Sequence, residues 1–482
     1  MPTKDRFGCC NQPHGNSPLW DGPGFSRRQF FRVAGSGITG FYFSKLARPL
    51  DVMAAGNVAT KGTARSCIFI FLTGAPSHTD TFDLKEGSWL PTFFAPTSYG
   101  DIRFPQGLMP NLADQLGKIA IVRTVQAWAT AHGLAQTWAQ IARNPTAALG
   151  KIAPNIGAVV ALEKEKTGAK LPGFIALNAA NAVGPGYLKS RYAPFGLNPN
   201  GAGLPGGTHP DGQVRFDTRI QLLNSLDTGL RIGSPLGRDV EDMGTFYEQA
   251  RGMMYNSQID GVFRYSADER RRYGQYPSGT GPNGSYGENA FGDACIVARN
   301  IVKANLGTSF VRIDLGGWDN HSNIYTEQGL FPRARSLDGG LSALLKDLTD
   351  APGLAPGKTL LDETLVVAMG EFGRTVSGPT SGSLNNQNGR DHFQQHFCVF
   401  AGGGIKGGRA IGSTNPSGAY VEDPGWERAR SVRPEDLAAT IYSTLGIDWT
   451  TIRYDDPFKR GFEYVPFAAS TDAYGPVNAL FG

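Results

Sequence analysis

The chain has 482 residues, 40% of them hydrophobic, which is enough for one large α/β domain with insertions and a sizeable core. Its 46 basic and 42 acidic residues leave a net charge of only +4, which argues against a nucleic-acid partner or attachment to an anionic membrane surface. The 64 glycines and 31 prolines indicate many loops and turns.

The N-terminal region resembles a twin-arginine export signal. Arg27 and Arg28 precede two phenylalanines and a modest, glycine-containing apolar run, and small residues around Ala54 fit cleavage. The alternative is an ordinary basic start of a helix. We expect 1–55 to be a signal region read by the twin-arginine machinery, and 56–482 to be periplasmic or extracellular. No other run has the ~20 apolar residues of a membrane span, so we expect no stable span in the mature form.

Three cysteines follow the expected signal and all lie in apolar runs. They are Cys67, Cys295 and Cys398, while Cys9 and Cys10 precede the arginine pair. An odd number of thiols in such runs does not indicate a disulfide framework, so we expect three small core residues.

Strand-like and helix-like segments alternate along the chain. Apolar runs rich in β-branched and aromatic residues predict buried strands at 66–72, 118–125, 173–178, 309–315, 364–370 and 396–403. Amphipathic patterns predict helices at 134–143, 155–166, 290–305, 333–349 and 434–445. This alternation predicts an α/β fold with a mostly parallel sheet between helix layers.

The middle of the chain, 180–288, is predicted to be an insertion or cap on that fold. It begins rich in glycine, proline and asparagine, and 216–275 is helical and polar in pattern. Arg270 to Arg272 indicate a solvated helix face, with a substrate-binding basic patch as the alternative. Long glycine-rich segments often gate sites, so a lid is one role open to the insertion.

Polar clusters follow several predicted strands, where ligands bind in parallel α/β sheets. After 66–72 come Ser77, His78, Thr79, Asp80, Thr81 and Asp83. After 309–315 come Asp319 and His321. After 364–370 come Glu371 and Arg374, and then Arg390, Asp391, His392 and His396. His132, after 118–125, is a fourth and weaker contributor, expected among the catalytic residues.

Five of the seven histidines lie in these segments, and imidazole with carboxylate is a common ligand set for zinc-like metals. Each pair taken alone has a structural alternative, since aspartates at strand ends often cap helices. The repetition at several strand ends favours one shared polar site. Arg374 and Arg390 are either binders of an oxyanion or salt-bridge partners, and His396 has the alternative of a buried structural residue.

Four spaced motifs resemble a known family. "IFLTGAPSHTDTFDLK", "RIDLGGWDNHSN", "VVAMGEFGRT" and "GRDH" occur in this order after the signal, as in the bacterial "domain of unknown function 1501" family, over about 64–470. That family is exported and is placed with the alkaline phosphatase and sulfatase superfamily. The resemblance implies an alkaline-phosphatase-like fold, with a mixed sheet between helices and commonly two divalent metals.

The resemblance also implies residue roles. It makes Ser77 the first choice of nucleophile, followed by Thr79 and Thr81, while Asp80 or Asp83 would replace the superfamily's first-strand aspartate. The superfamily's later Asp-His pair meets Glu371-Phe372 here, which departs from its pattern. Asp319 and His321 match its middle motif, and Asp391 and His392 match its closing one.

We therefore expect an exported, metal-dependent hydrolase of phosphate or sulfate esters, acting on a small-molecule or polysaccharide ester. The expected cofactor is one or two divalent ions (Zn, Ca, Mg or Mn). Ser77 or a metal-bound water would attack, and Arg374 or Arg390 would stabilise charge. The expected ligands are His78, Asp80, Asp319, His321, Glu371, Asp391 and His392. The alternatives are a secreted binding or assembly protein, recognising anionic polysaccharide, and purely structural clusters that hold no metal.

Overall fold

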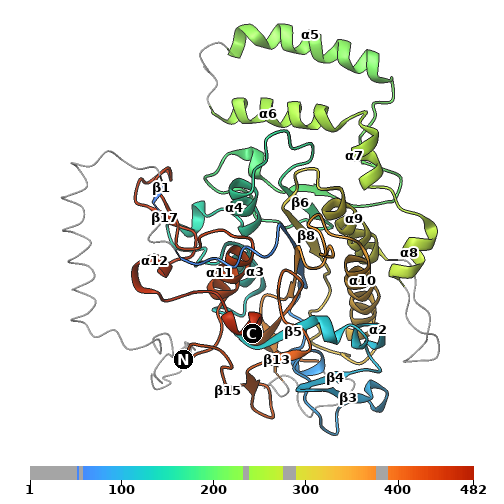
Figure 1. Ribbon diagram of the computed structural model, residues 1–482, viewed down its shortest axis with the longest axis vertical. Coiled ribbons are helices and arrows are strands. Elements are labelled where there is room, and N and C mark those ends of the chain that lie inside the picture. Colours follow the sequence, from blue (N-terminus) through green and yellow to red (C-terminus); the bar gives the residue numbers. More distant parts are fainter. Residues whose placement is uncertain (1–51, 54–57, 232–237, 275–288, 376–388) are drawn as a thin grey trace, which may run out of the picture. The chain divides into compact units, whose positions relative to one another are not determined.

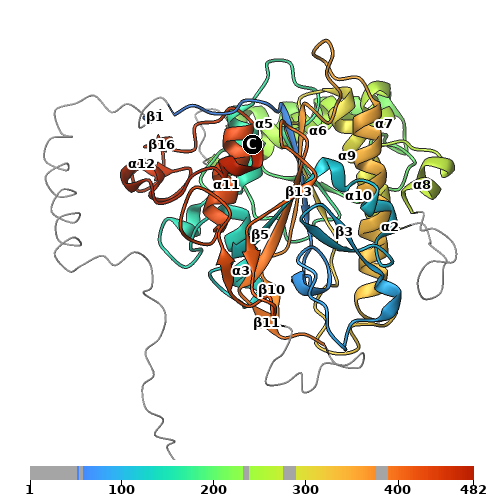
Figure 2. The ribbon, with the colours of Figure 1, turned by 60° about the horizontal axis from the view of Figure 1, so that its bottom comes forward.

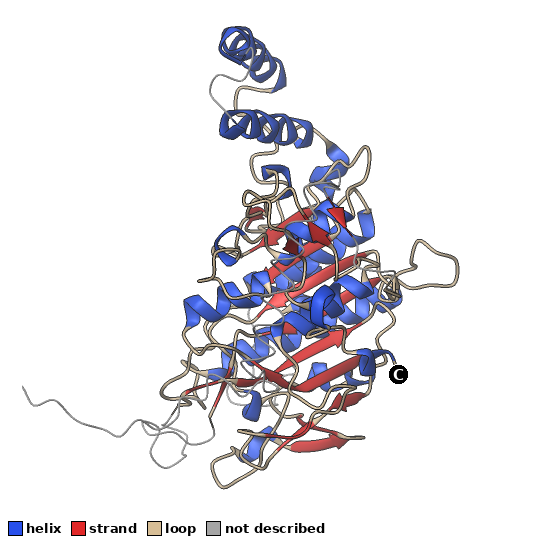
Figure 3. Ribbon diagram, turned by 90° about the vertical axis from the view of Figure 1, so that its left-hand side faces the viewer, coloured by secondary structure: helices blue, strands red, loops and turns tan. Residues whose placement is uncertain are grey.

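An eight-stranded β-sheet lies at the centre of the computed structural model (Figure 1), which describes residues 52–53, 58–231, 238–274, 289–375 and 389–482. The expected twin-arginine pair lies outside these residues. The strands lie in the order β13-β5-β12-β9-β2-β8-β6-β7, side by side as Figure 3 shows. Their bounds are β2 (Ser66–Phe71), β5 (Ile119–Gln126), β6 (Phe174–Leu177), β7 (Phe195–Leu197), β8 (Phe310–Asp314), β9 (Thr364–Met369), β12 (Gln395–Ala401) and β13 (Arg409–Ile411).

The sheet is mostly parallel, which confirms the predicted fold class. Among its described strands, β12 runs antiparallel to its neighbours β5 and β9, and the others share one direction. Phe71 pairs with Asp314 of β8 on one side and with Met369 of β9 on the other. Three neighbouring strands therefore end at the same level, and the loops that follow them start together.

Alternate side chains of each strand enter two cores, one on each face of the sheet. Ile68 and Ile70 of β2 belong to one core, and Phe69 and Phe71 belong to the other. Successive side chains of a strand point to opposite faces, so both faces of β2 need cover, and helices supply it. Burying each of these side chains stabilises the fold by roughly 1.5–3 kcal/mol.

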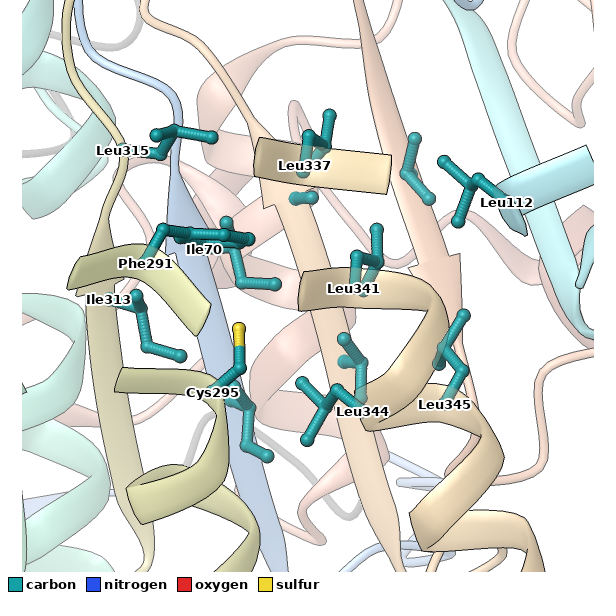
Figure 4. Packing of buried hydrophobic residues seen from close by; sticks show 14 of the residues in the cluster. Ile70, Leu112, Phe291, Cys295, Ile313, Leu315, Leu337, Leu341, Leu344 and Leu345 are labelled. Atoms are coloured by element: carbon teal, nitrogen blue, oxygen red, sulfur yellow. The ribbon is translucent and has the colours of Figure 1, made fainter. Parts of the chain in front are cut away.

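Helices cover both faces (Figure 2). One core packs α2 (Pro110–Ala113), α9 (Ala290–Ala304) and α10 (Leu330–Asp350), and Figure 4 shows leucines of α10 against the strands. The other packs α3 (His132–Ile141), α4 (Ile156–Glu163) and α11 (Pro434–Thr444). These bounds confirm the five predicted helices to within three residues. The three cysteines expected in the core, Cys67, Cys295 and Cys398, are buried and unpaired.

Four small sheets of two or three strands accompany the main sheet in the described residues, and the sequence patterns did not predict them. They are β1 (Val52–Met53) with β16 (Ile452–Arg453) and β17 (Phe462–Glu463), β3 (Pro96–Tyr99) with β4 (Ile102–Pro105), β10 (Gly373–Arg374) with β11 (His392–Phe393), and β14 (Ser413–Thr414) with β15 (Val421–Asp423). A short helix, α12 (Ala468–Thr471), lies near the C-terminal end of the chain.

The second part of the expected insertion is helical, as predicted for 216–275, and contains α5 (Gln213–Arg231), α6 (Arg238–Met253), α7 (Ser257–Val262) and α8 (Ala267–Tyr273). Its first part contributes β7 to the main sheet, beside β6. α7 packs on α9, and α8 packs on α9 and α10, so these two helices cover a helix layer and not the strand ends where a lid was considered. Arg270 and Arg272 contribute by pairing with Asp293 and Asp347, 2.9 and 2.6 Å away, which favours a structural role over a substrate-binding patch.

Within the described part of the chain, no helix is both long enough and apolar enough to cross a bilayer.

Candidate metal centre

Four loops meet at the edge of the sheet where the parallel strands end. Asp319 follows β8, Glu371 follows β9, and His132 is the first residue of α3 after β5. His392 lies on β11, just before the antiparallel β12. A fifth loop, after β2, comes close to the loop of Asp319 at Gly74, where φ is +104° and a Cβ atom would lie 2.8 Å from the backbone nitrogen of Asp319. Only glycine fits that position without displacing the loop that carries Asp319.

Asp319 is the hub of the cluster. Its Oδ1 lies 3.3 Å from Nε2 of His132 and 3.4 Å from Nε2 of His392. It also lies 3.0 Å from Nε2 of His321 and 2.5 Å from Nη2 of Arg374. Burial alone would raise the pKa of Asp319, but the hydrogen bond and charge of Arg374, with the nearby histidines, lower that pKa to about 2. The carboxylate is therefore ionised at any physiological pH, and 45% of its side chain is open to solvent.

Two imidazoles are held with the same nitrogen facing Asp319. Nδ1 of His132 is 2.7 Å from Oε1 of Glu371, and Nδ1 of His392 is 2.8 Å from the carbonyl oxygen of Thr130. Both partners accept hydrogen bonds, so each Nδ1 carries the proton and each neutral ring has a lone pair on Nε2. Nε2 of His132 is buried and has no hydrogen-bond partner.

A divalent cation fits this donor set. Ligand atoms of His132, Asp319 and His392 all lie within 4.8 Å of one another. Two imidazole lone pairs facing a carboxylate oxygen repel one another unless a proton or a cation lies between them. Two imidazoles and a carboxylate are also a ligand set that zinc and related metals accept, with positions left for water or substrate.

Glu371 is buried next to the cluster, and its carboxylate is already hydrogen-bonded to protein donors. Its side chain is fully buried, and its Oε1 accepts hydrogen bonds from His132, from Nε2 of Gln136 at 3.0 Å and from the backbone of Gly74 at 3.0 Å. The bond to Glu371, more than any other influence, raises the pKa of His132. Glu371, expected as a ligand, is thus placed so that its carboxylate orients the ring of His132.

His321 and Asp391 lie on the exposed side. Nε2 of His321 is 3.0 Å from Nε2 of His392, and its Nδ1 is 3.7 Å from Oδ1 of Asp391. Burial, and then the charge of Arg374, lower the pKa of His392 and keep that ring neutral. Phe372 forms an apolar wall, with its ring centroid 4.8 Å from that of His132 and 4.7 Å from that of His392.

Arg374 is buried and engaged at all of its nitrogens. Nε donates to the carbonyl of Ala75 at 2.8 Å, Nη2 to the carbonyl of Gly74 at 2.6 Å and to Asp319, and Nη1 to the carbonyl of Arg390 at 3.2 Å. This guanidinium fixes Asp319 and joins three loops. It is therefore placed as a positioning group, where the sequence left open an oxyanion role or a salt bridge.

Ser77, Asp80 and Arg390 form a second cluster that is buried beside the first. Nε and Nη2 of Arg390 lie 3.1 and 3.2 Å from the two oxygens of Asp80. Ser77 donates to Oδ2 of Asp80 at 2.6 Å, and Tyr325 donates to Oδ1. The remaining nearby hydroxyls are buried as well, on Thr79 and Thr81. The Asp80 oxygens are occupied by protein donors and Ser77 is only 3% exposed, so neither residue is open to solvent as Asp319 is.

His78 and His396 are buried apart from the solvent-exposed cluster. His78 lies in a short 3-10 helix (His78–Asp80), and its Nε2 is 2.8 Å from the carbonyl of Gly418. Its Nδ1 accepts from the backbone of Arg374 at 3.3 Å, so neither nitrogen is left for a metal. Burial lowers the pKa of His78, and it lowers the pKa of His396 to about 3. Both rings are neutral, which matches the buried alternative considered for His396.

Sequence reasoning missed two supporting groups, Gln136 and the carbonyl of Thr130. Gln136 lies four residues after His132 on α3, so both side chains share one helix face, and this spacing is a signal that could have found it. The carbonyl of Thr130 carries no signal in the sequence, because every residue has one.

A protein-family model matches most of the chain. The family model described as "Protein of unknown function (DUF1501)" matches residues 64–457, which confirms the resemblance seen in the motifs. No curated protein matches the sequence.

Several solved structures resemble the chain at low identity. Ps i-CgsB in complex with k-i-k-neocarrahexaose is 14% identical, with a TM-score of 0.35 over 80% of this chain and 72% of that one. The PsFucS1 sulfatase from Pseudoalteromonas sp. is 12% identical, with a TM-score of 0.33 over 88% and 72%. A protein in the alkaline phosphatase superfamily from Vibrio parahaemolyticus is 9% identical, with a TM-score of 0.34 over 88% and 76%.

Proposed function

The chain belongs to the DUF1501 family, and we propose that it is an exported hydrolase that uses a divalent metal to cleave phosphate or sulfate esters. The observation that supports this most directly is the convergence of Nε2 of His132 and Nε2 of His392 on Oδ1 of Asp319. Each ring is fixed through its other nitrogen, so the lone pairs are aimed in advance of binding.

Each residue of the cluster has a role in this proposal. His132, Asp319 and His392 hold the cation, which when bound would polarise an ester oxygen and acidify water. Glu371 and the carbonyl of Thr130 keep the two rings in the ligand tautomer. Arg374 holds the Asp319 carboxylate in place through the 2.5 Å contact of its Nη2. His321 and Asp391 line the exposed side, where an ester enters.

We assign the attack to a water molecule and not to Ser77. The Ser77 hydroxyl is buried and donates to Asp80, which is itself paired with Arg390. A hydroxyl in that position cannot reach an ester held beside the exposed Asp319 unless the buried cluster opens. Water has direct access, because 48% of the His321 side chain is exposed next to Asp319.

A second candidate function is binding without catalysis. It is favoured by the buried position of Ser77 and by Phe372, whose ring packs against both His132 and His392 at the position where the superfamily pattern implies a further histidine. The chain would then hold an anionic ligand at the cluster and release it unchanged.

Metal content tests the proposal. Wild-type protein purified without chelator should carry a divalent metal in elemental analysis, and the double variant His132→Ala/His392→Ala should fall to the buffer level. His209→Ala is the matched control, because His209 lies in the insertion near Phe216 and outside the cluster. Glu371→Gln should weaken metal affinity roughly 10–100-fold, because the acceptor that orients His132 loses its charge. Unchanged metal content in the double variant would refute the site.

Turnover separates the two candidate functions. Metal-loaded wild type is assayed on p-nitrophenyl phosphate and p-nitrophenyl sulfate before and after chelation. Hydrolysis that disappears with chelator and returns with added metal supports the hydrolase. Tight metal binding with rates equal to the buffer blank on both esters supports the binding protein.

A further inference from the structure

The loop between β5 and α3 carries an exposed tryptophan. Trp128 is 45% exposed, although it lies in a well-packed part of the molecule between the buried Ala127 and the first turn of α3. An indole of this size would bury more surface if it were free to fold against its neighbours. The ring is therefore held partly outward, by contacts with Glu435, Trp138 and Arg433.

A buried carboxylate pins the ring. Glu435, the second residue of α11, accepts from Nε1 of Trp128 at 3.0 Å through one oxygen and from Nε1 of Trp138 at 2.8 Å through the other. Glu435 is only 3% exposed, and burying a carboxylate is costly unless donors satisfy it. The two indoles, whose planes differ by 25° and whose centroids are 6.0 Å apart, are therefore held as a rigid pair.

The guanidinium of Arg433 places a positive charge against the ring of Trp128. The guanidinium carbon of Arg433 lies 3.9 Å from the ring centroid of Trp128, close enough for a strong cation–π contact. Arg433 precedes α11, and its Nη1 donates to the carbonyl of Gln126 at 3.3 Å, at the end of β5. The Trp128–Arg433 pair thus combines an exposed apolar ring with a fixed cation.

Trp128 lies on the same loop as two groups of the candidate metal centre. Thr130, whose carbonyl orients His392, is two residues after Trp128, so their Cα atoms are at most about 7 Å apart. His132 follows two residues later as the first residue of α3. Figure 2 shows α3 beside β5, β10 and β11, the elements that carry these groups. A ligand that is bound at the metal centre and extends along this loop would reach Trp128.

We propose that Trp128 and Arg433 form a subsite for a sugar ring of an anionic saccharide, next to the metal centre. The proposal rests on the proposed function and names its substrate class, a sulfated or phosphorylated saccharide. The apolar face of the sugar packs on the exposed part of the indole, and a negatively charged substituent pairs with Arg433. A nucleic acid is disfavoured, since the chain's 46 basic and 42 acidic residues are nearly balanced.

Binding to metal-free protein tests this subsite separately from the metal centre. Chelator-treated wild type is titrated calorimetrically with sulfated tetrasaccharides from carrageenan, chondroitin sulfate and fucoidan, and with their desulfated counterparts. At least one sulfated tetrasaccharide should bind. Trp128→Ala should raise its Kd at least tenfold, Trp128→Phe should bring the Kd back to within threefold of wild type, and Arg433→Ala should remove the preference for the sulfated form. Phe458→Ala is the matched control and should leave Kd unchanged, because Phe458 is 47% exposed on another loop.

Three results would overturn the subsite: wild type binds none of the three sulfated tetrasaccharides, Trp128→Ala binds like wild type, or only AMP, included as a nucleotide probe, binds in a Trp128-dependent way. Thermal melting of each variant shows whether it is folded. Metal analysis remains the test of the metal centre, so a chain that binds saccharide through Trp128 and carries no metal would refute the hydrolase and leave the subsite standing.

Discussion

Replacing Asp80 by alanine should destabilise this protein more than almost any other single change near the site. Arg390 is 1% exposed and Asp80 is completely buried, so the pair lies outside the reach of solvent. Removing Asp80 leaves a guanidinium charge in the interior, with Tyr325 as its remaining side-chain partner at 2.8 Å. Nη1 of Arg390 is already without a hydrogen bond. Breaking a buried ion pair in this way costs about 3–5 kcal/mol.

One further loss accompanies that cost. Tyr325 donates to Asp80, and a buried hydroxyl left without an acceptor costs about 1–3 kcal/mol more, whereas Ser77 can still donate to the hydroxyl of Thr79 at 3.1 Å. The double variant Asp80→Ala/Arg390→Met removes the stranded charge as well, so it should recover most of the loss. Chemical unfolding at pH 7, followed by circular dichroism, measures the free energy of unfolding of each variant.

An exposed ion pair provides the matched control. Arg103 and Glu86 lie 2.5 Å apart with 40% and 47% of their side chains exposed, and such pairs contribute about 1 kcal/mol or less. Glu86→Ala should therefore change the free energy of unfolding little. If Asp80→Ala costs no more than Glu86→Ala, or if adding Arg390→Met recovers nothing, then a buried unpaired charge is not what destabilises the Asp80→Ala variant.

Two further predictions concern pH and export. Burial of Asp338 under α2 raises its pKa from 3.8 to about 7, so its contribution to stability is full below about pH 4 and is lost as pH rises through 7; the loss is on the order of 4 kcal/mol at most. Asp338→Asn should flatten the difference between urea midpoints at pH 5 and pH 8, and an unchanged pH dependence would contradict the assignment. Lysine at both Arg27 and Arg28 should leave the full-length chain in the cytoplasm of a bacterial host, and an unchanged periplasmic fraction on an immunoblot would argue against the twin-arginine route.

The fold could be predicted because its core strands have no exposed face. Segments such as 66–72 and 364–370 are uninterrupted apolar runs, which is the pattern of strands covered on both sides. The start of α11 could also be predicted, because Pro434 in the first turn is followed by Glu435 and Asp436. The edge strands β7 and β13 were not predicted, because each has only three residues, which is too few to show a strand pattern.

The composition of the site could be predicted only in part. Asp319, His321 and His392, expected at one site, lie together, and so does His132, which was expected as a weaker, catalytic contributor. The sequence could not show which carboxylates remain open to solvent. Asp319 is paired with Arg374 and is still 45% exposed, whereas Asp80 is buried with Arg390, and Glu371 is buried with His132 and a backbone amide. Whether a carboxylate is a ligand or a support depends on donors that approach from distant parts of the chain.

The direction of β12 explains why His392 precedes its strand, whereas Asp319 and Glu371 follow theirs. Parallel strands bring their C-terminal ends to one edge, which collects the loops carrying Asp319 and Glu371. Because β12 runs the opposite way between β5 and β9, its first residues lie at that same edge, and β11 delivers His392 there just before β12 begins. An apolar run has no visible direction in sequence. A parallel β12 would have carried His392 to the opposite edge of the sheet, away from His132, and the three ligand atoms could not have met.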